Sequence, residues 1–232
     1  MGNSPQNSEF TERLRQEVPF FEGFGLEVLQ ETIVHVSIRS HPANQVILLE
    51  HDWGGSVYFV MDGWVKIRTH NVDGREVTLN IVGRGEIVGE MAAIEEAPRS
   101  TDVITLTPAE VCSVPAMEFY NFLKTESMAG IRLAQIIARR LRQLNRRLRL
   151  REAESLTRVA DTLLFLAEGR GRDTGKGVII PNLPHRELSS ISGLARETVT
   201  RCLTKLEKRG LIHRESDFIS VANLKDLEDL IS

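Results

Sequence analysis

The apolar residues of this chain change their spacing near residue 115, and that change limits the possible folds more than any other feature. From residue 9 to about residue 31 the apolar residues recur at helical spacing, which predicts short helices. From residue 34 to residue 114 they alternate with polar ones or form short β-branched runs, which is typical of strands. The hairpin dipeptides Asp62-Gly63 and Asp73-Gly74 separate some of these runs. Many short strands joined by turns favour an antiparallel barrel or jelly roll over a parallel α/β sheet. The expected strands cover residues 34–38, 45–50, 56–61, 64–70, 76–82, 101–105 and 111–114.

Beyond this point the spacing becomes helical, so the fold class is α+β. A long helix is expected from about residue 115 or 128 to residue 151. Its apolar positions follow alternating steps of three and four residues, the pattern of a coiled-coil seam, and they are Ala134, Ile137, Leu141, Leu144 and Leu148. The other faces are rich in arginine, so this narrow stripe predicts a partner helix and a parallel homodimer. The alternative is that the stripe packs against the chain's own domain.

The charge of the chain is divided unevenly along its length. The 232 residues carry a net charge of −3, yet residues 1–125 hold 9 basic and 18 acidic residues, whereas residues 126–232 hold 20 basic and 14 acidic ones. The first part is therefore at −9 and the second at +6. Such an asymmetry predicts a polyanionic partner for the second part alone.

The segment from residue 183 to residue 212 has the pattern of a helix-turn-helix. Two helices are expected around the turn Ser192-Gly193-Leu194, from apolar positions at Leu188, Ile191, Leu194, Val199, Leu203 and Leu206. An apolar pair of strands follows, which predicts a small β wing. The structure expected here is a winged helix-turn-helix that binds double-stranded DNA, and the alternative is a surface helix with ordinary charges.

The outward face of the second helix has the chemistry for reading bases. Arg196 and Arg201 suit the O6 and N7 of guanine, and Glu197 suits the N4 of cytosine. Thr198 and Thr200 suit phosphate oxygens, which fix the register of a complex without reading sequence. Lys205, Lys208 and Arg209 extend that expected phosphate contact.

A second motif runs from residue 85 to residue 94 and continues at residues 98–101. Gly89 permits a close backbone approach, and a helical turn beginning at Glu90 offers free N–H groups that suit a phosphate. Arg99 adds a fixed cation for phosphate oxygens, while Glu90 suits a sugar hydroxyl. Met91 and Ser100 belong to the same strings. The motif predicts a site for a ribose cyclic phosphate; the alternative is a plain salt bridge between Glu90 and Arg99.

The string from Gly193 to Arg201, GLARETVTR, resembles the recognition helix of the CRP/FNR family of bacterial transcription regulators, and the resemblance covers about residues 14–225. It implies a cyclic-nucleotide-binding sensor domain at residues 1–125, a dimerisation helix at residues 126–154 and a winged helix-turn-helix DNA-binding domain at residues 155–232. It also implies that Arg196, Glu197 and Arg201 contact a TGTGA-like half-site, repeated as a palindrome. RNA polymerase is a further implied partner, through the loop at residues 168–177.

The second motif is similar to the phosphate-binding cassette of this family. The resemblance implies cyclic AMP as the allosteric effector. It also places Leu144 and Asn145 of the long helix at the purine, with Leu79 and Asn80 of the barrel near the ligand. The alternative is a regulator of the same family that binds DNA without a nucleotide effector, or with a different one. A more distant alternative is a signalling module whose C-terminal domain contacts proteins.

Several classes of protein are excluded by what the sequence lacks. Two isolated cysteines, Cys112 and Cys202, rule out a disulfide scaffold and an iron–sulfur sensor, and Cys112 is expected to be a buried, inert thiol. Neither a metal site nor a nucleophile–base set is evident, so no enzymatic activity is expected. Because no run of 18 apolar residues and no signal peptide is present, we expect a cytoplasmic protein without membrane contact.

Overall fold

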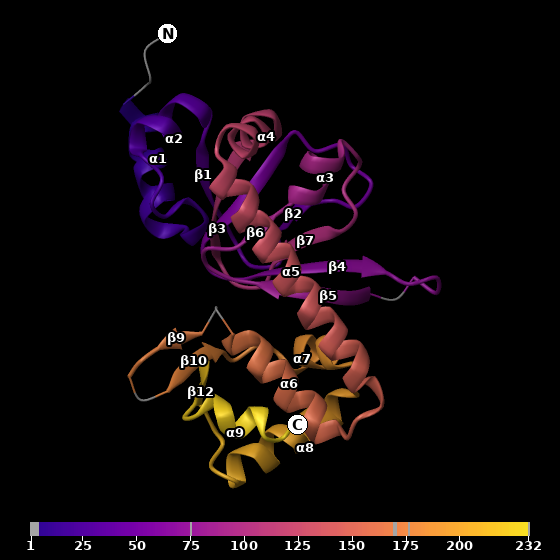
Figure 1. The fold of residues 1–232 in the computed structure, drawn as a ribbon. Coiled ribbons are helices and arrows are strands. Elements are labelled where there is room, and N and C mark those ends of the chain that lie inside the picture. Colours follow the sequence, from indigo (N-terminus) through magenta and orange to yellow (C-terminus); the bar gives the residue numbers. More distant parts are fainter. Residues whose placement is uncertain (1–4, 75, 169–170, 176, 232) are drawn as a thin grey trace. The chain divides into compact units, whose positions relative to one another are not determined.

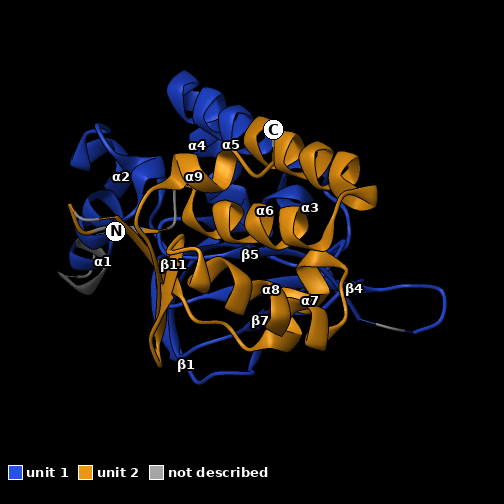
Figure 2. Ribbon diagram, turned by 90° about the horizontal axis from the view of Figure 1, so that it is seen from below, with its two compact units in different colours: residues 1–137 blue, residues 138–232 orange. Residues whose placement is uncertain are grey.

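The computed structural model describes residues 5–74, 76–168, 171–175 and 177–231. The chain divides into two compact units, Met1–Ile137 and Ala138–Ser232, which Figures 1 and 2 show as ribbons. The first unit contains the predicted strands together with several short helices. The second contains the predicted helix-turn-helix.

Two four-stranded antiparallel sheets form the centre of the first unit. One has the order β1-β8-β3-β6 and the other the order β2-β7-β4-β5. Their bounds are β1 (Ser37–His41), β2 (Val46–Leu48), β3 (Ser56–Asp62), β4 (Val65–His70), β5 (Glu76–Val82), β6 (Ile87–Val88), β7 (Asp102–Thr105) and β8 (Ala109–Pro115). The predicted jelly roll is confirmed, but it consists of two separate sheets and is not a closed barrel. The first strand begins at Ser37, three residues later than expected.

Apolar side chains fill the space between these sheets. Val60 and Val111 of the first sheet pack there with Val65 and Val103 of the second. Tyr58 and Ile67 lie partly buried against the same cluster. Since side chains on a strand alternate between faces, these residues identify the inner face of each sheet.

A second core lies on the other face of the β1-β8-β3-β6 sheet. Phe59 of β3 and Cys112 of β8 are fully buried there. The covering helices are α1 (Pro5–Glu17), η1 (Pro19–Phe21), α2 (Leu26–Thr32) and α4 (Ala116–Thr125). Phe20 and Phe21 of η1 contact Phe59 at ring centroid distances of 5.7 and 4.8 Å. Burial raises the pKa of the Cys112 thiol to about 12, as suits the inert thiol that the sequence predicted.

The predicted long helix is divided at Glu126. After α4, helix α5 (Ser127–Arg149) begins, and a 3₁₀ turn, η2 (Leu150–Glu152), follows it. Ala129 and Leu133 of α5 are buried in the first unit. The helix start near residue 128 was therefore the correct one of the two that the sequence left open.

The second unit contains the part of α5 from Ala138 onward, one antiparallel sheet and four further helices, α6 (Ser155–Ala167), α7 (His185–Ser192), α8 (Arg196–Lys208) and α9 (Leu224–Glu228). That sheet has the order β11-β12-β10-β9, with β9 (Arg172–Asp173), β10 (Val178–Pro181), β11 (Ile212–Arg214) and β12 (Phe218–Val221). The pair β11–β12 is the predicted wing after the second helix of the helix-turn-helix. In the described part of the chain, no helix is long and apolar enough to cross a membrane.

Candidate functional site

Arg99 is the most deeply buried cation of the predicted phosphate site, with only 3% of its surface exposed. It lies between helix α3 (Glu90–Glu95) and strand β7. Its Nη1 donates to the carbonyl oxygen of Gly89 at 2.6 Å, and its Nη2 donates to that of Ser56. Its Nε is buried and has no hydrogen-bond partner among the described residues. Burial lowers the pKa of Arg99, against the opposite influence of Tyr58 and Glu90.

Two glycines make room for this guanidinium. Gly89, directly before α3, has a φ of 80°, and a Cβ there would overlap Nη1 of Arg99. A Cβ on Gly54 would overlap the Nε, Cζ and Nη2 atoms. Glu90 follows Gly89 as the first residue of α3 and is 4% exposed. A buried cation whose hydrogen-bonding capacity is incompletely used favours the approach of an anionic group.

Asn80 faces the space between the two sheets. It pairs across the ladder with Ile67, which packs in the inter-sheet core. The register then shifts, so that Arg68 pairs with Thr78 and Leu79 is the additional residue of a bulge. Asn80 is 9% exposed, and its Oδ1 is buried without a hydrogen-bond partner among the described residues.

Tyr58 lies close both to Arg99 and to the inter-sheet core that Asn80 faces. It packs against the inter-sheet core, and the guanidinium of Arg99 lies 5.9 Å from the centre of its ring. Arg99 and Asn80 therefore both lie close to this inter-sheet cluster, and each has a buried polar atom without a hydrogen-bond partner in the part of the chain that the structure describes. Residues that can donate to a phosphate and bond to a polar ring edge are the ones a cyclic nucleotide requires.

The other predicted ligand residues are more exposed. Met91 is 48% exposed on α3, Leu79 is 37% exposed in the bulge, and Ser100 is exposed directly after Arg99. Leu144 and Asn145 lie on the part of α5 that belongs to the second unit, where Leu144 is 44% exposed and Asn145 is also exposed.

The helix-turn-helix has the geometry that its sequence predicted. Gly193 ends α7 with a φ of 64°, in the left-handed region that favours glycine. The Nε and Nη2 of Arg158, from α6, donate to the carbonyl oxygen of Ser192 at 3.1 and 2.6 Å. Nη2 also donates to the carbonyl oxygen of Gly193 at 3.1 Å. Arg158 therefore connects α6 to the turn and stabilises it.

Helix α8 exposes its polar face. Arg196, Glu197, Thr200 and Arg201 are exposed, whereas Thr198 is half-buried. Arg201 Nη2 donates to the Thr198 hydroxyl at 3.2 Å, and the Thr200 hydroxyl donates to the carbonyl oxygen of Arg196 at 2.9 Å. The inward residues are fully buried, namely Val199, Leu203 and Leu206. The helix therefore presents two arginines and a carboxylate together at its N-terminal half.

Sequence reasoning missed the residues that surround Arg99 and the turn. Gly54, Ser56 and Tyr58 lie more than 40 positions before Arg99, and Arg158 lies 34 positions before Ser192. The one available signal was the Gly54-Gly55 dipeptide, which marks a place where the backbone is approached closely. In the predicted loop at residues 168–177, residues 169, 170 and 176 lie outside the described residues, and the short strand β9 lies within it.

Comparison with known proteins matches both units. Residues 38–126 fit the family model of the cyclic nucleotide-binding domain, and residues 157–230 fit that of the Crp-like helix-turn-helix domain. The chain belongs to the CRP/FNR family of transcription regulators. The family that the motifs indicated is thereby confirmed. As a member of this family, the chain is a DNA-binding transcription regulator with a cyclic nucleotide-binding domain.

Relatives within the CRP/FNR family match along most of the chain. The chain is 28% identical over 213 residues to a protein of Thermus thermophilus named cyclic AMP receptor protein, covering 91% of this chain and 96% of that protein. It is 27% identical over 195 residues to the cAMP-activated global transcriptional regulator CRP of Salmonella typhimurium, covering 83% and 93%. Among solved structures, FixK2 from Bradyrhizobium japonicum has a TM-score of 0.73 at 21% identity, covering 85% of this chain and 98% of that one, and it supports the fold alone.

Proposed function

We propose that this protein is a cyclic-AMP-responsive transcription regulator that binds a palindromic, TGTGA-like DNA site as a homodimer and recruits RNA polymerase. In this proposal residues 1–125 are the sensor domain, residues 126–154 the dimerisation helix and residues 155–232 the DNA-binding domain. Cyclic AMP is the allosteric effector. The names of two relatives, a cyclic AMP receptor protein and a cAMP-activated regulator, support that choice of nucleotide.

The observation that carries the ligand assignment is the pair of unsatisfied buried atoms, Arg99 Nε and Asn80 Oδ1. Arg99 supplies a desolvated cation for the phosphate, and Glu90 accepts from the ribose 2′-hydroxyl. Gly89 keeps the backbone close to the sugar and phosphate. A bound anion would accept hydrogen bonds from the guanidinium of Arg99. Such charge-assisted hydrogen bonds are about twice as strong as neutral ones.

The remaining ligand residues are assigned by resemblance, with support from their exposure. Met91 and Ser100 flank the phosphate end, and Leu79 and Asn80 lie toward the base. Leu144 and Asn145 meet the purine from α5, where Asn145 offers a donor and an acceptor to an adenine edge. Because the same helix carries the dimer seam, a ligand that contacts these residues would favour one arrangement of the seam over another.

The exposed seam of α5 supports a homodimer. Ile137, Leu141, Leu144 and Leu148 are 43%, 55%, 44% and 60% exposed in the single chain. A row of leucine and isoleucine side chains at coiled-coil spacing is stabilised by a matching row on a second copy. Two copies would then present two α8 helices to half-sites about 34 Å apart, one turn of DNA.

On the DNA, Arg196, Glu197 and Arg201 would read bases while Thr198 and Thr200 hold phosphates. Recruitment of RNA polymerase rests on the resemblance of the loop at residues 168–177 alone.

Calorimetry with cyclic AMP and with cyclic GMP tests the ligand assignment. We expect wild-type protein to bind cyclic AMP, and Arg99→Ala to lose at least about tenfold in affinity, because a hydrogen-bonded charge pair contributes at least that much. Arg84→Ala is the matched control, since Arg84 is an exposed arginine of the same unit with 61% of its side chain accessible. Equal binding by wild type and Arg99→Ala would contradict the assignment.

A mobility-shift assay on a TGTGA-containing palindrome tests the switch. We expect cyclic AMP to increase DNA affinity, and the double variant Arg196→Ala, Glu197→Ala to lose specific binding while it still binds the nucleotide. Equal DNA affinity with and without cyclic AMP would support a regulator without this effector. Unchanged DNA binding by the double variant would contradict the base-reading role of Arg196 and Glu197. Absence of specific DNA binding by the wild type would support a module whose C-terminal domain contacts proteins.

A further inference from the structure

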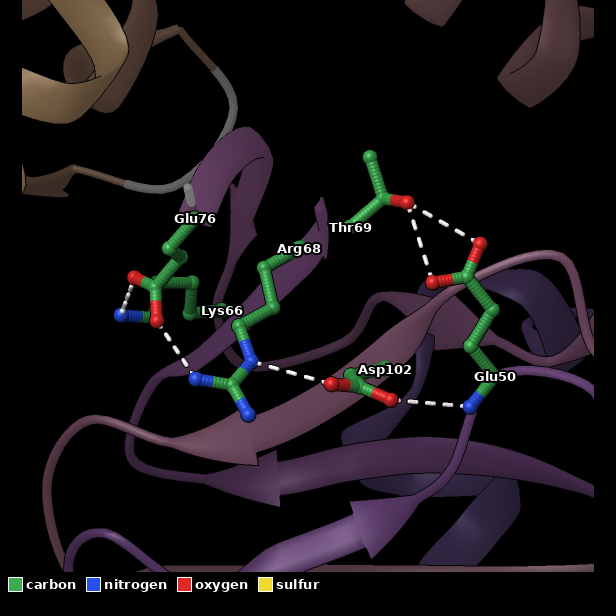
Figure 3. A network of polar contacts seen from close by, with 6 residues as sticks. All are labelled: Glu50, Lys66, Arg68, Thr69, Glu76 and Asp102. Carbon is green, nitrogen blue, oxygen red and sulfur yellow. Dashed lines mark hydrogen bonds and ion pairs between the residues drawn. The ribbon is translucent and has the colours of Figure 1, made fainter. Parts of the chain in front are cut away.

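A chain of charged side chains crosses the β2-β7-β4-β5 sheet (Figure 3). Lys66 Nζ donates to one carboxylate oxygen of Glu76 at 2.6 Å, and Arg68 Nη1 donates to the other at 2.5 Å. Arg68 Nε donates to Asp102 Oδ2 at 3.1 Å. Asp102 Oδ1 in turn accepts from the backbone N–H of Glu50 at 2.8 Å. The network therefore joins β4 and β5 to the start of β7 and to Glu50, two residues after the end of β2.

Much of this network is removed from solvent. Lys66 and Asp102 are each 6% exposed, and the side chain of Arg68 is 23% exposed. Burial raises the pKa of Glu76, but the hydrogen bonds from Lys66 and Arg68 outweigh it and lower that pKa overall. Buried charges with this degree of pairing hold their partners in fixed geometry, since breaking one pair leaves an uncompensated charge.

The network lies on the sheet face opposite to the ligand-facing interior. Arg68 and Asp102 are direct cross-strand partners, next to the pair Ile67–Val103 that packs in the inter-sheet core. Because successive side chains point to opposite faces, Arg68 and Asp102 point away from that core. They therefore do not belong to the set of residues that line the interior beside Tyr58 and Asn80.

Asp102 is nevertheless connected to the backbone of Arg99 through residues 50–52. The Arg99 N–H donates to the carbonyl oxygen of Asp52 at 2.9 Å, and the His51 N–H donates to the carbonyl oxygen of Arg99 at 2.8 Å. The bond from Glu50 N to Asp102 Oδ1 extends this pairing by one more contact. The backbone of Arg99 is thus held by two hydrogen bonds to residues 51 and 52. The neighbouring residue, Glu50, is held in turn by the side chain of Asp102.

We propose that Asp102, held in place by Arg68, is a positioning residue for Arg99 and thereby sets the affinity of the sensor for the cyclic phosphate. This inference rests on the proposed function, in which Arg99 binds that phosphate. Arg68 fixes the Asp102 carboxylate, which fixes the segment from Glu50 to Asp52, and this segment fixes the Arg99 backbone. The guanidinium is held at its other end by the carbonyl oxygens of Gly89 and Ser56.

Three single variants test the inference. Asp102→Asn removes the charge that Arg68 binds, and Arg68→Gln removes the cation. Glu110→Gln is the matched control, because Glu110 also binds an arginine through both oxygens, Arg13 at 2.7 and 3.3 Å, in the same unit. We expect Asp102→Asn and Arg68→Gln to weaken cyclic AMP binding by about tenfold, within the usual range of coupling between contacting residues, and Glu110→Gln to leave it unchanged. Equal affinities for all three variants would overturn the inference.

A double-mutant cycle separates positioning from a general loss of stability. Asp102→Asn is combined with Arg99→Lys, which retains a cation but lacks the planar guanidinium. If Asp102 acts through the Arg99 guanidinium, its replacement changes affinity less than about twofold in the Arg99→Lys background. A full tenfold loss in both backgrounds would mean that Asp102 acts by another route, and the inference would fail.

A third measurement does not depend on ligand binding. The Nε–Hε signal of Arg99 in a ¹⁵N NMR spectrum is assigned by its loss in Arg99→Lys. We expect Asp102→Asn to shift or broaden this signal and Glu110→Gln to leave it in place. An unchanged signal in Asp102→Asn refutes the positioning role. If wild-type protein binds no cyclic nucleotide, the proposed function fails, and this signal still decides whether Asp102 positions Arg99.

Discussion

At the scale of single residues, the candidate site depends on the position of the Arg99 guanidinium. Its guanidinium occupies the space where a side chain of Gly54 or Gly89 would be, and it bonds to two backbone carbonyls. Gly89 has a positive φ, so its replacement also strains the backbone. Gly54 has no such φ, and its substitution changes the available space alone.

We therefore predict that Gly54→Ala weakens cyclic AMP binding by about tenfold, because small displacements of a positioned group carry large costs. The thermal unfolding midpoint should remain close to that of the wild type, since alanine suits this backbone conformation. Calorimetry and a thermal melt measure the two quantities. Gly55→Ala is the matched control, because a Cβ there meets nothing within 4 Å. Equal binding by the two variants would show that Gly54 does not confine Arg99.

At the scale of elements, α5 has two different apolar surfaces. Ala129 and Leu133 near its start are buried against the first unit. Farther along, Leu141 and Leu148 are more than half exposed. Apolar residues spaced three and four apart can pack either within the chain or against another copy, and the sequence pattern does not distinguish the two. The exposure of Leu141 and Leu148 favours packing against another copy for this part of α5.

We predict that Leu141→Glu converts the proposed homodimer to a monomer at micromolar concentration. Two carboxylates facing each other in an apolar seam cost several kcal/mol, so the dissociation constant should rise by about 100-fold or more. Sedimentation equilibrium measures this constant. Arg139→Glu introduces the same residue on an exposed position outside the seam and should leave the dimer intact. If Leu141→Glu remains dimeric, the seam is not the contact.

At the scale of the whole molecule, the division of charge follows the division of function. In the proposed function, the acidic first part, at −9, binds a small anion through one buried arginine, and the basic second part, at +6, offers many cations to a polyanion. Lys205, Lys208 and Arg209 are exposed at the end of α8 and beyond it. Net charge alone, at −3, conceals this arrangement.

We predict that DNA affinity falls steeply between about 50 and 200 mM salt, because each neutralised phosphate contributes a slope of about −0.9 to the plot of log affinity against log salt. Lys208→Ala should make this slope shallower by about one unit for each recognition helix. Lys124→Ala, an exposed lysine of the first unit, should leave it unchanged. Fluorescence anisotropy over a salt series gives both slopes. A slope unaffected by Lys208→Ala would remove that residue from the phosphate contacts.

The sequence by itself determined the elements and the family. Alternation and hairpin dipeptides predicted most strands within a few residues, and the Ser192-Gly193-Leu194 turn with its flanking apolar positions predicted α7 and α8. The strings around Glu90 and Arg99 indicated a phosphate site. These features are local, since each depends on residues within one or two turns of chain, and local periodicity records which face of an element is buried.

Only the tertiary structure decided the order of the strands, the division of the jelly roll into two sheets and the bulge at Leu79. It also decided which residues surround Arg99, and it joined Arg68, Asp102 and Glu50, which are 34 and 52 positions apart, into one network. Such contacts depend on packing between distant segments, and side-chain periodicity holds no information about which strands become neighbours. The residues that hold Arg99 in position could therefore be identified only from the folded structure.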